Sequence, residues 1–214
     1  MTIDPALTPW PHEDAVDRWA ALHADVDRGS AAYHQLLATH RVLQDRLAAA
    51  TPPPEVADRL SAMLRDVSDL LAEHQAPEAN RWDGWQFDQP GRGMPVLPPF
   101  VVDDSDDSSL RGRVTFGRFY LGGNGAAHGG TPPLLFDDVM GRLANHGYPG
   151  VARTAFLKVN YRRITPIDVE LTFEVTRDLV EGRKRWVSGR LYNPAGEIAC
   201  DAQGLFLQLL PGQQ

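Results

Sequence analysis

Residues 128–141, which read HGGTPPLLFDDVMG, decide the fold predicted for this chain. Thr131 is a residue type that often caps a helix, and Pro132 suits the first helical position, where a backbone N–H has no partner to lose. Apolar side chains then recur at helical spacing, namely Leu135, Phe136, Val139, Met140 and Leu143. The stretch therefore predicts a helix that is largely buried.

The start of this helix is rich in glycine, with Gly129 and Gly130 directly before the expected cap. Glycine lets a ligand approach the backbone closely, and the unpaired N–H groups at a helix start carry partial positive charge. A carboxylate, Asp137, follows about one and a half turns further along. The resulting hypothesis is that a ligand can reach the N-terminal end of the helix at Gly129 and Gly130, here called the helix mouth, and that an acid lies nearby.

The two adjacent acids of the helix differ in the residue that lies four positions further on. Asp138 has Arg142 at that spacing, which favours a solvated ion pair, so we interpret Asp138 as the surface acid. Asp137 has Gly141 there and no charge partner on its own helix, so we expect it to face a closely packed element. An ordinary acid stabilised by the helix dipole is an equally good interpretation of Asp137 from residue types alone.

Three features of the stretch occur together: HGG, an acid nine residues after His128, and a glycine four residues after that acid. Three later segments continue the pattern in order, at residues 154–163, 181–188 and 204–207. Together they resemble the hotdog-fold acyl-CoA thioesterase superfamily of the PaaI and 4-hydroxybenzoyl-CoA type, and are similar to the THEM-type thioesterases. The resemblance covers about half of the chain, roughly residues 112–211. It implies an antiparallel sheet wrapped around a central helix.

The alternation of apolar residues predicts the same architecture independently of the family. Strand-like alternation occurs at 112–121, before the helix, and in four segments after it: 151–162, 169–175, 183–192 and 198–210. A strand, a helix and four strands joined by short loops favour an antiparallel sheet curled around one apolar helix. The predicted fold class is therefore α+β, a hotdog fold with an N-terminal α-helical extension.

Residues 1–78 predict that helical extension, with helices at 12–28, from Ser30 to about residue 50, and from the prolines at 52–54 to about residue 75. Ser30 is the expected N-cap of the second helix, and the prolines separate the second helix from the third. The third has the clearest apolar stripe, which must be buried against the rest of the chain or against a second subunit.

Residues 79–111 are rich in proline, glycine and aspartate, which is typical of a linker. Four aromatic residues indicate that part of this linker docks on the body of the protein: Trp82, Trp85, Phe87 and Phe100. Residues 96–102 are a candidate short strand, and the acidic run 103–107 is expected to be a solvated loop. Residues 112–214 then form the predicted hotdog thioesterase domain.

The overall composition argues against several classes of protein. A net charge of −7 does not favour general nucleic-acid binding. The single cysteine, Cys200, rules out an intrachain disulfide and fits a reducing cytoplasm. No apolar run reaches membrane-spanning length and the first residues do not resemble a signal peptide, so we expect a cytoplasmic protein with no membrane partner. The histidines form no HExxH motif or compact cluster, so we expect neither a metal nor another cofactor.

Thioester hydrolysis requires a hydrogen-bond donor for the carbonyl oxygen and a base for water. The resemblance assigns the donor to the Gly129 N–H, and the base or direct nucleophile to Asp137. Thr154 matches a hydroxyl residue that the family contributes from the facing subunit, where it would orient the water. The resemblance therefore also implies at least a homodimer, with each acyl-CoA site at the interface.

Further candidates lie near the helix mouth and at the strand ends. His128 is expected to shape the glycine turn rather than act as a general acid, and Asn124 and Gly130 are candidates for contacting substrate. Basic residues that could bind the phosphates of CoA are Arg162, Arg163, Arg183, Lys184 and Arg185. Solubilising charges on strand ends are an equally good interpretation of this set.

The chain departs from the family pattern in two places. Pro132 and Pro133 remove two N–H groups near the helix mouth, and the helical extension has no counterpart in the minimal fold. The extension can cap the acyl tunnel, build a larger oligomer or bind a partner. Acyl-CoA hydrolysis is the leading hypothesis. Its alternatives are a non-catalytic acyl-CoA-binding or scaffold protein, and a hydratase or dehydratase that pairs a catalytic histidine with an acid.

Overall fold

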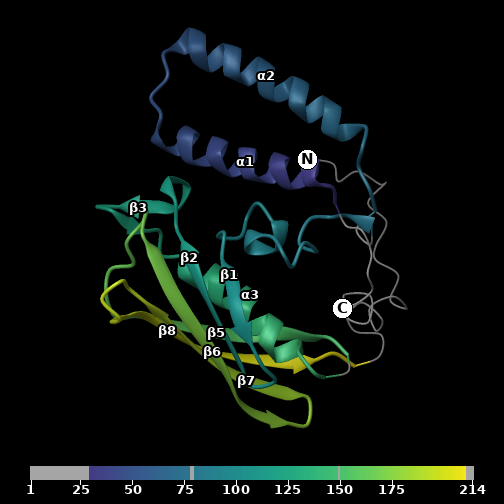
Figure 1. Cartoon of the computed structure of the whole chain (residues 1–214), viewed down its shortest axis with the longest axis vertical. Helices are drawn as coiled ribbons and strands as arrows, with labels where there is room; N and C mark the ends of the chain where they lie inside the picture. Colours follow the sequence, from purple (N-terminus) through teal and green to yellow (C-terminus); the bar gives the residue numbers. More distant parts are fainter. Residues whose placement is uncertain (1–28, 78–79, 149, 211–214) are drawn as a thin grey trace.

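The computed structural model describes residues 29–77, 80–148 and 150–210. Figure 1 shows two N-terminal helices stacked on one side of a curved antiparallel sheet, with a third helix against that sheet. The predicted α+β fold with an N-terminal helical part is thereby confirmed. The helix predicted at 12–28 lies outside the described residues.

The main sheet has six strands in the order β1-β2-β6-β7-β8-β5. Their bounds are β1 (Val101–Ser105), β2 (Ser109–Thr115), β5 (Ala152–Tyr161), β6 (Glu170–Glu181), β7 (Lys184–Tyr192) and β8 (Ile198–Gln208). All neighbouring strands are antiparallel. A separate hairpin, β3 (Leu121–Gly123) with β4 (Ala126–Ala127), leads into the central helix. The order leaves β1 and β5 as the two edge strands of the main sheet.

The central helix, α3 (Thr131–Asn145), packs against this sheet. The five predicted core side chains are all 0–1% exposed: Leu135, Phe136, Val139, Met140 and Leu143. Gly189 of β7 permits close contact, because a Cβ at that position would lie 2.8 Å from the Phe136 ring. The buried helix is confirmed, although Gly130 is its cap and Thr131 its first residue.

Two arginines of the sheet hold the C-terminal end of α3. Arg185 of β7 donates to the carbonyl of Ala144 at 2.9 Å, and Arg177 of β6 donates to the carbonyl of His146 at 2.8 Å. Both guanidiniums lie over the Tyr148 ring, and their charge opposes the negative pole of the helix. Arg185 is only 1% exposed, so its interpretation as a phosphate-binding or solubilising surface residue is wrong.

The strand predicted at 112–121 is longer than the observed one. β2 ends at Thr115, and the chain then forms the short helix η5 (Arg118–Tyr120). The N–H of Phe119 in η5 donates to the Asp45 carboxylate at 2.8 Å, which fixes this turn against the first N-terminal helix. A contact so distant in the sequence overrides the local alternation of apolar residues.

The acidic run 103–107 is only partly a loop. β1 continues through Ser105 because it pairs with β2, so the prediction of a solvated loop over the whole run is wrong. The turn begins at Asp106, whose carboxylate accepts the N–H groups of Ser108 and Ser109, both at 2.7 Å. These hydrogen bonds lower the pKa of Asp106 to about 2.

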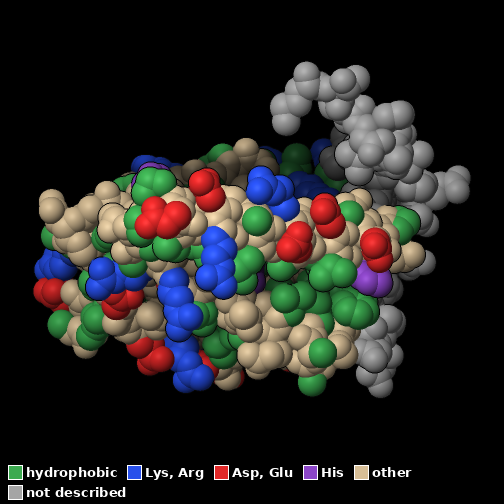
Figure 2. All heavy atoms as spheres, turned by 90° about the horizontal axis from the view of Figure 1, so that it is seen from above, with side chains coloured by type: hydrophobic (Ala, Val, Ile, Leu, Met, Phe, Trp, Pro, Cys, Tyr) green, Lys and Arg blue, Asp and Glu red, His purple; other side chains and the backbone are tan. Residues whose placement is uncertain are grey.

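Two of the predicted N-terminal helices are observed, as α1 (Ala31–Ala49) and α2 (Pro54–Ala72). Ser30 caps α1 as predicted, since its Oγ accepts the N–H of Tyr33 at 3.3 Å. α2 lies on the outer side of α1 (Figure 1) and buries none of its side chains against the described residues. The expected burial of its apolar stripe is therefore not met within these residues. Figure 2 looks down on this side of the molecule, where hydrophobic side chains show between charged ones.

Candidate active site

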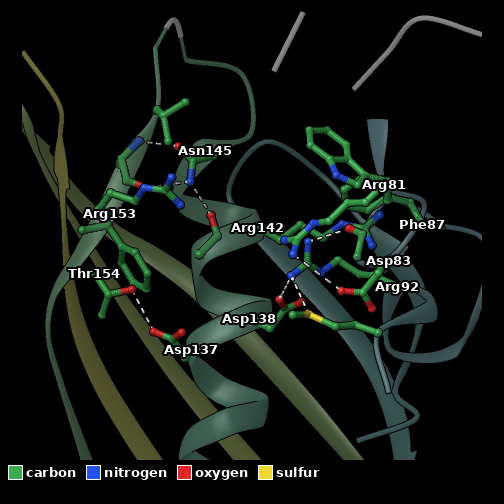
Figure 3. Close-up of a pocket in the computed structure, with 17 residues that line it drawn as sticks. Arg81, Asp83, Phe87, Arg92, Asp137, Asp138, Arg142, Asn145, Arg153 and Thr154 are labelled. Carbon is green, nitrogen blue, oxygen red and sulfur yellow. Dashed lines mark hydrogen bonds and ion pairs between the residues drawn. The ribbon is translucent and has the colours of Figure 1, made fainter. Parts of the chain in front are cut away.

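The candidate base and the candidate hydroxyl residue meet in the structure. The Oγ of Thr154, near the start of β5, donates to Oδ1 of Asp137 on α3 at 2.8 Å (Figure 3). Both side chains are exposed in the single chain. The resemblance implies a hydroxyl from the facing subunit, whereas here Thr154 reaches Asp137 of its own chain.

Asn145, the last residue of α3, sets the distance between these two elements. Its Nδ2 donates to the Gly141 carbonyl at 2.8 Å, and its Oδ1 accepts the N–H of Ala152 at 2.7 Å. Ala152 lies two residues before Thr154, so one buried amide joins the end of α3 to the start of β5. Patterns in the sequence do not single out Asn145, because its role depends on two elements meeting in space.

The N–H groups at the mouth of α3 are not equally available. The Gly130 N–H donates to Nδ1 of His128 at 3.0 Å, and the Thr131 N–H donates to the carbonyl of His128 at 2.8 Å. The next two residues are prolines, which have no N–H. Among the described residues, the N–H of Gly129 has no hydrogen-bond partner. It is therefore the amide that can bind a carbonyl oxygen.

The helix mouth is also tied to β5 and to the β3–β4 hairpin. The Tyr161 hydroxyl, at the end of β5, donates to the Gly129 carbonyl. A Cβ at Gly122 of β3 would lie 2.7 Å from the Cα of His128, so the hairpin packs closely on that residue. Asn124 lies in the hairpin turn with a φ of +50°. The cavity next to Asp137 is lined neither by Asn124 nor by His128, Gly129 or Gly130, so within one chain the helix mouth and this cavity are separate.

Asp138 is not the surface acid that the helical spacing predicts. Its carboxylate pairs with Arg92 at 2.6 Å, and its side chain is 11% exposed. Burial raises the pKa of Asp138, and Arg92 only partly opposes this effect. Arg142, the predicted partner, instead lies over the Phe87 ring at 5.5 Å. The prediction is wrong because Arg92 and Phe87 come from a distant loop, whose position helical spacing cannot show.

That loop, residues 81–94, forms one wall of a cavity of about 250 Å³ beside Asp137. The other walls are α3 and the start of β5, with Phe206 of β8 (Figure 3). The lining residues from the loop are Arg81, Asp83, Gly84, Trp85, Phe87, Arg92 and Met94, and those from α3 and β5 include Asp137, Asp138, Arg142, Arg153 and Thr154. The aromatic residues of the linker indicated this docking, but nothing in the sequence indicated that it would complete a cavity.

The helical extension holds this loop in place. Arg41 of α1 donates to the carbonyls of Leu97 at 2.9 Å, and of Pro90 and Met94 at 3.1 Å. His34 of α1 contacts Gln86 through its Nε2 at 2.7 Å. The position of the cavity wall therefore depends on α1.

The basic residues predicted to bind CoA phosphates do not form one group. Arg162 pairs with Asp201, Arg163 with Glu197 at 3.0 Å, Lys184 with Glu181 at 3.8 Å, and Arg183 donates to the Gln208 carbonyl at 2.9 Å. On β8, Cys200 pairs with the end of β5 and Leu207 with the start of β7. The two arginines after β5 and the two basic residues at the start of β7 thus lie at opposite ends of the sheet.

Within residues 29–77, 80–148 and 150–210, no cluster of histidine, cysteine and acidic side chains could hold a metal ion. In the same residues, no helix is both long and apolar enough to cross a membrane.

No protein-family model and no curated protein matches the chain. A solved thioesterase superfamily protein is 29% identical, with a TM-score of 0.71, and the match covers 84% of this chain and 96% of that protein. The chain has the hotdog fold of the thioesterase superfamily. Since the main sheet begins at Val101, a match over 84% of the chain also includes much of what precedes the sheet.

Two other hotdog proteins are similar over about half of the chain. The protein smu.793 from Streptococcus mutans, solved with acetyl CoA, is 17% identical with a TM-score of 0.50, covering 53% of this chain and 91% of its own. Thioesterase superfamily member 2 from Mus musculus is 16% identical with a TM-score of 0.47, covering 50% of this chain and 80% of its own. The share covered by smu.793 agrees with the extent of the resemblance in sequence.

Proposed function

We propose that this protein hydrolyses the thioester of an acyl-CoA to the free acid and CoA. The observation that carries the proposal is the hydrogen bond from Thr154 to Asp137 at the wall of the cavity. In this mechanism Asp137 takes a proton from water, Thr154 orients the carboxylate and the water, and the Gly129 N–H binds the thioester oxygen.

The ion pairs of the site favour Asp137 over Asp138 as the base. The Asp138 side chain is only 11% exposed and its Oδ1 is paired with Arg92 at 2.6 Å, so an attacking water has little access to this carboxylate. In the described part of the chain, no lysine or arginine forms a salt bridge with Asp137, and its hydrogen bond from Thr154 uses one of its two oxygens. The second oxygen of Asp137 is free to accept a proton from water.

The helix mouth supplies the other half of the chemistry. Negative charge develops on the thioester oxygen as water attacks, and a fixed N–H donor at that point is worth about a hundredfold to a thousandfold in rate. Gly129 presents such a donor, and the N–H groups after it are bonded to His128 or absent. The His128 ring therefore stabilises the conformation of the helix mouth, because its Nδ1 accepts the N–H of Gly130.

The hotdog proteins that match this chain also favour a CoA thioester as substrate. A thioesterase superfamily protein matches over most of the chain, and smu.793 was solved with acetyl CoA. Arg162, Arg163, Arg183 and Lys184 stay candidates for the CoA phosphates. Because they lie at two ends of the sheet, one pair alone would serve a given site.

The test is release of free thiol from a panel of short, long and aromatic acyl-CoAs. Asp137→Asn is expected to lower kcat about 10²- to 10⁴-fold, with unchanged circular dichroism and Tm, because the side chain is exposed and buries no core surface. Asp66→Asn, on the exposed α2, is the matched control and should keep the wild-type rate. An Asp137→Asn protein as active as the control would overturn the assignment of the base.

If no acyl-CoA of the panel is hydrolysed while several bind, the protein is the non-catalytic acyl-CoA-binding form of this fold. Isothermal titration with the same esters separates that outcome from a protein that does not recognise CoA esters.

A further inference from the structure

The cavity beside Asp137 carries more positive charge than its acids can neutralise. Four arginines line it, Arg81, Arg92, Arg142 and Arg153, against three acids, Asp83, Asp137 and Asp138. The surplus is one positive charge, in a chain whose net charge is −7. A cavity with the opposite sign to the whole molecule favours an anion inside it.

Two of the four arginines already have a carboxylate partner. Arg92 pairs with Asp138 at 2.6 Å, and Arg81 lies 3.9 Å from Asp83. These pairs leave Arg142 and Arg153 as the cations able to meet a ligand. Neither forms a salt bridge or a hydrogen bond within the part of the chain that the structure describes.

Arg142 is partly shielded from water. It lies on α3, half-buried, with its guanidinium over the Phe87 ring at 5.5 Å. Burial lowers the pKa of Arg142, and Asp138 attracts it without bonding to it. A partly desolvated cation that lacks a bonded anion gains more from binding one than an exposed cation does.

The two arginines and the proposed base line the same cavity. Arg153 directly precedes Thr154, whose hydroxyl bonds to Asp137. Arg142 is five residues after Asp137 on the same helix, which is about 7.5 Å along the axis and about 140° around it. A ligand bound in the cavity can therefore meet the base at one point and an arginine at another.

The volume of the cavity sets the size of the ligand. At about 250 Å³ it has room for roughly eight groups of the size of water, which a small acyl group fills. We propose that the cavity is an acyl subsite that selects a small acyl group ending in a carboxylate, bound by Arg142 and Arg153. This inference rests on the proposed function, since it places the thioester carbon at Asp137.

The phosphates of CoA are the other anions that could meet these arginines. With the thioester at Asp137, the pantetheine arm holds the phosphates far from the reacting carbon. Arg142 and Arg153 lie beside the proposed base. The carboxylate of the acyl group is therefore the anion that their positions fit.

The test compares adipyl-CoA with hexanoyl-CoA, which have acyl chains of equal length and differ in the terminal carboxylate. The full chain is assayed for thiol release, with blanks that lack enzyme. We expect kcat/KM to be about ten- to a hundredfold higher for adipyl-CoA, the gain typical of a hydrogen bond to a charged group. In the double variant Arg142→Gln with Arg153→Gln, the ratio of kcat/KM for adipyl-CoA to that for hexanoyl-CoA should fall towards one.

Two further variants separate the subsite from effects on folding. Arg153→Gln alone changes an exposed side chain and should reduce the ratio without lowering Tm. Arg46→Gln, an exposed arginine on α1, is the matched control and should keep the wild-type ratio. Equal kcat/KM for the two esters in the wild type, or an unchanged ratio in the double variant, overturns the subsite.

A binding measurement separates failure of the subsite from failure of the proposed function. In Asp137→Asn, isothermal titration with adipyl-CoA, hexanoyl-CoA and free CoA measures recognition without turnover. Tighter binding of adipyl-CoA supports the subsite even if the wild type hydrolyses neither ester, in which case the proposed function fails alone. An equal loss of affinity for all three ligands in the double arginine variant would show that the arginines bind CoA phosphates, and would overturn the subsite.

Discussion

Arg92 connects the loop that walls the cavity to the central helix. Its backbone is in the left-handed region, with a φ of +57°, which is unfavourable for a residue other than glycine. Its guanidinium donates to the Gly84 carbonyl at 2.8 Å and pairs with Asp138 at 2.6 Å. These two contacts offset the cost of the backbone conformation and attach the loop to α3.

Substituting Arg92 should make stability depend more strongly on pH. Burial already raises the pKa of Asp138 above its usual value, and Arg92→Met removes the cation that opposes this, so the pKa rises further. An acid whose pKa is higher in the folded state costs stability as pH rises through the interval between the unfolded and folded pKa values. We expect Arg92→Met to lose about 3 kcal/mol of unfolding free energy at pH 8 and clearly less at pH 4, measured by urea unfolding.

The control for this prediction is the double variant Arg92→Met with Asp138→Asn, which has no carboxylate to titrate at this site. Relative to this double variant, Arg92→Met should lose more unfolding free energy at pH 8 than at pH 4. A single variant Arg92→Met with equal losses at pH 4 and pH 8 contradicts the prediction, because the cost would then arise from packing alone.

The two adjacent acids, Asp137 and Asp138, show how far the roles of single residues can be predicted from the sequence. Glycine at the helix mouth and an acid at a fixed spacing are enough to identify Gly129 and Asp137 as candidates, because both belong to one continuous stretch of chain. Asp138 was assigned wrongly, since its partner Arg92 is 46 positions away in the sequence and approaches through a loop. Arg142 and Arg153 were missed as ligand-binding residues for the same reason.

At the scale of elements, α1 positions the loop that completes the cavity. Arg41 donates to three carbonyls of that loop region, including those of Leu97 and Met94. Tyr33, on the same helix, packs edge-on against Trp82 with ring centroids 5.0 Å apart. The extension is thus linked to the site by side chains of one helix, which favours a cap over the acyl group among the three roles considered for it.

Removing the Arg41 guanidinium should loosen the loop without unfolding the hotdog core. Arg41→Met keeps the aliphatic length but loses hydrogen bonds to three carbonyls, each worth about 1 kcal/mol or more. We expect faster amide hydrogen exchange in residues 84–97 and a severalfold higher KM for acyl-CoA. Arg46→Met, five residues along α1, is the control. Unchanged exchange in this loop would contradict a positioning role for α1.

The elements themselves were largely predictable. The α3 core, the Ser30 cap and most of the later strands follow a strong local period, and the structure has them within a few residues. The strand predicted at 169–175 is longer in the structure, where β6 continues to Glu181. The strand predicted at 112–121 is too long, because the chain turns after Thr115 and the Phe119 N–H donates to Asp45. The prediction of a loop over the acidic run 103–107 was wrong because β1 pairs with β2 despite its aspartates. Local sequence patterns thus predict the elements except where a contact with a residue distant in the sequence favours a different local structure.

At the scale of the whole molecule, the two edges of the main sheet differ. β1 is short and carries Asp103 and Asp104, which discourage pairing with another chain. β5 (Ala152–Tyr161) is twice as long, and its outer edge is unpaired in the single chain, with Phe156 43% and Tyr161 55% exposed. Since β5 also carries Thr154, a second copy paired along this edge would cover the exposed Asp137 and complete the site.

This contrast predicts a dimer through β5. The wild-type chain should sediment at no less than twice its mass of 23.6 kDa at micromolar concentration. Ala155→Lys places a charge on an exposed residue at the bulge of β5 and should shift the protein towards one copy, with loss of thioesterase activity. Ser105→Lys, on the opposite edge strand, should change neither mass nor activity. A wild-type protein that sediments as one copy and is fully active would mean that a single chain completes its own site, as the contact between Thr154 and Asp137 within one chain allows.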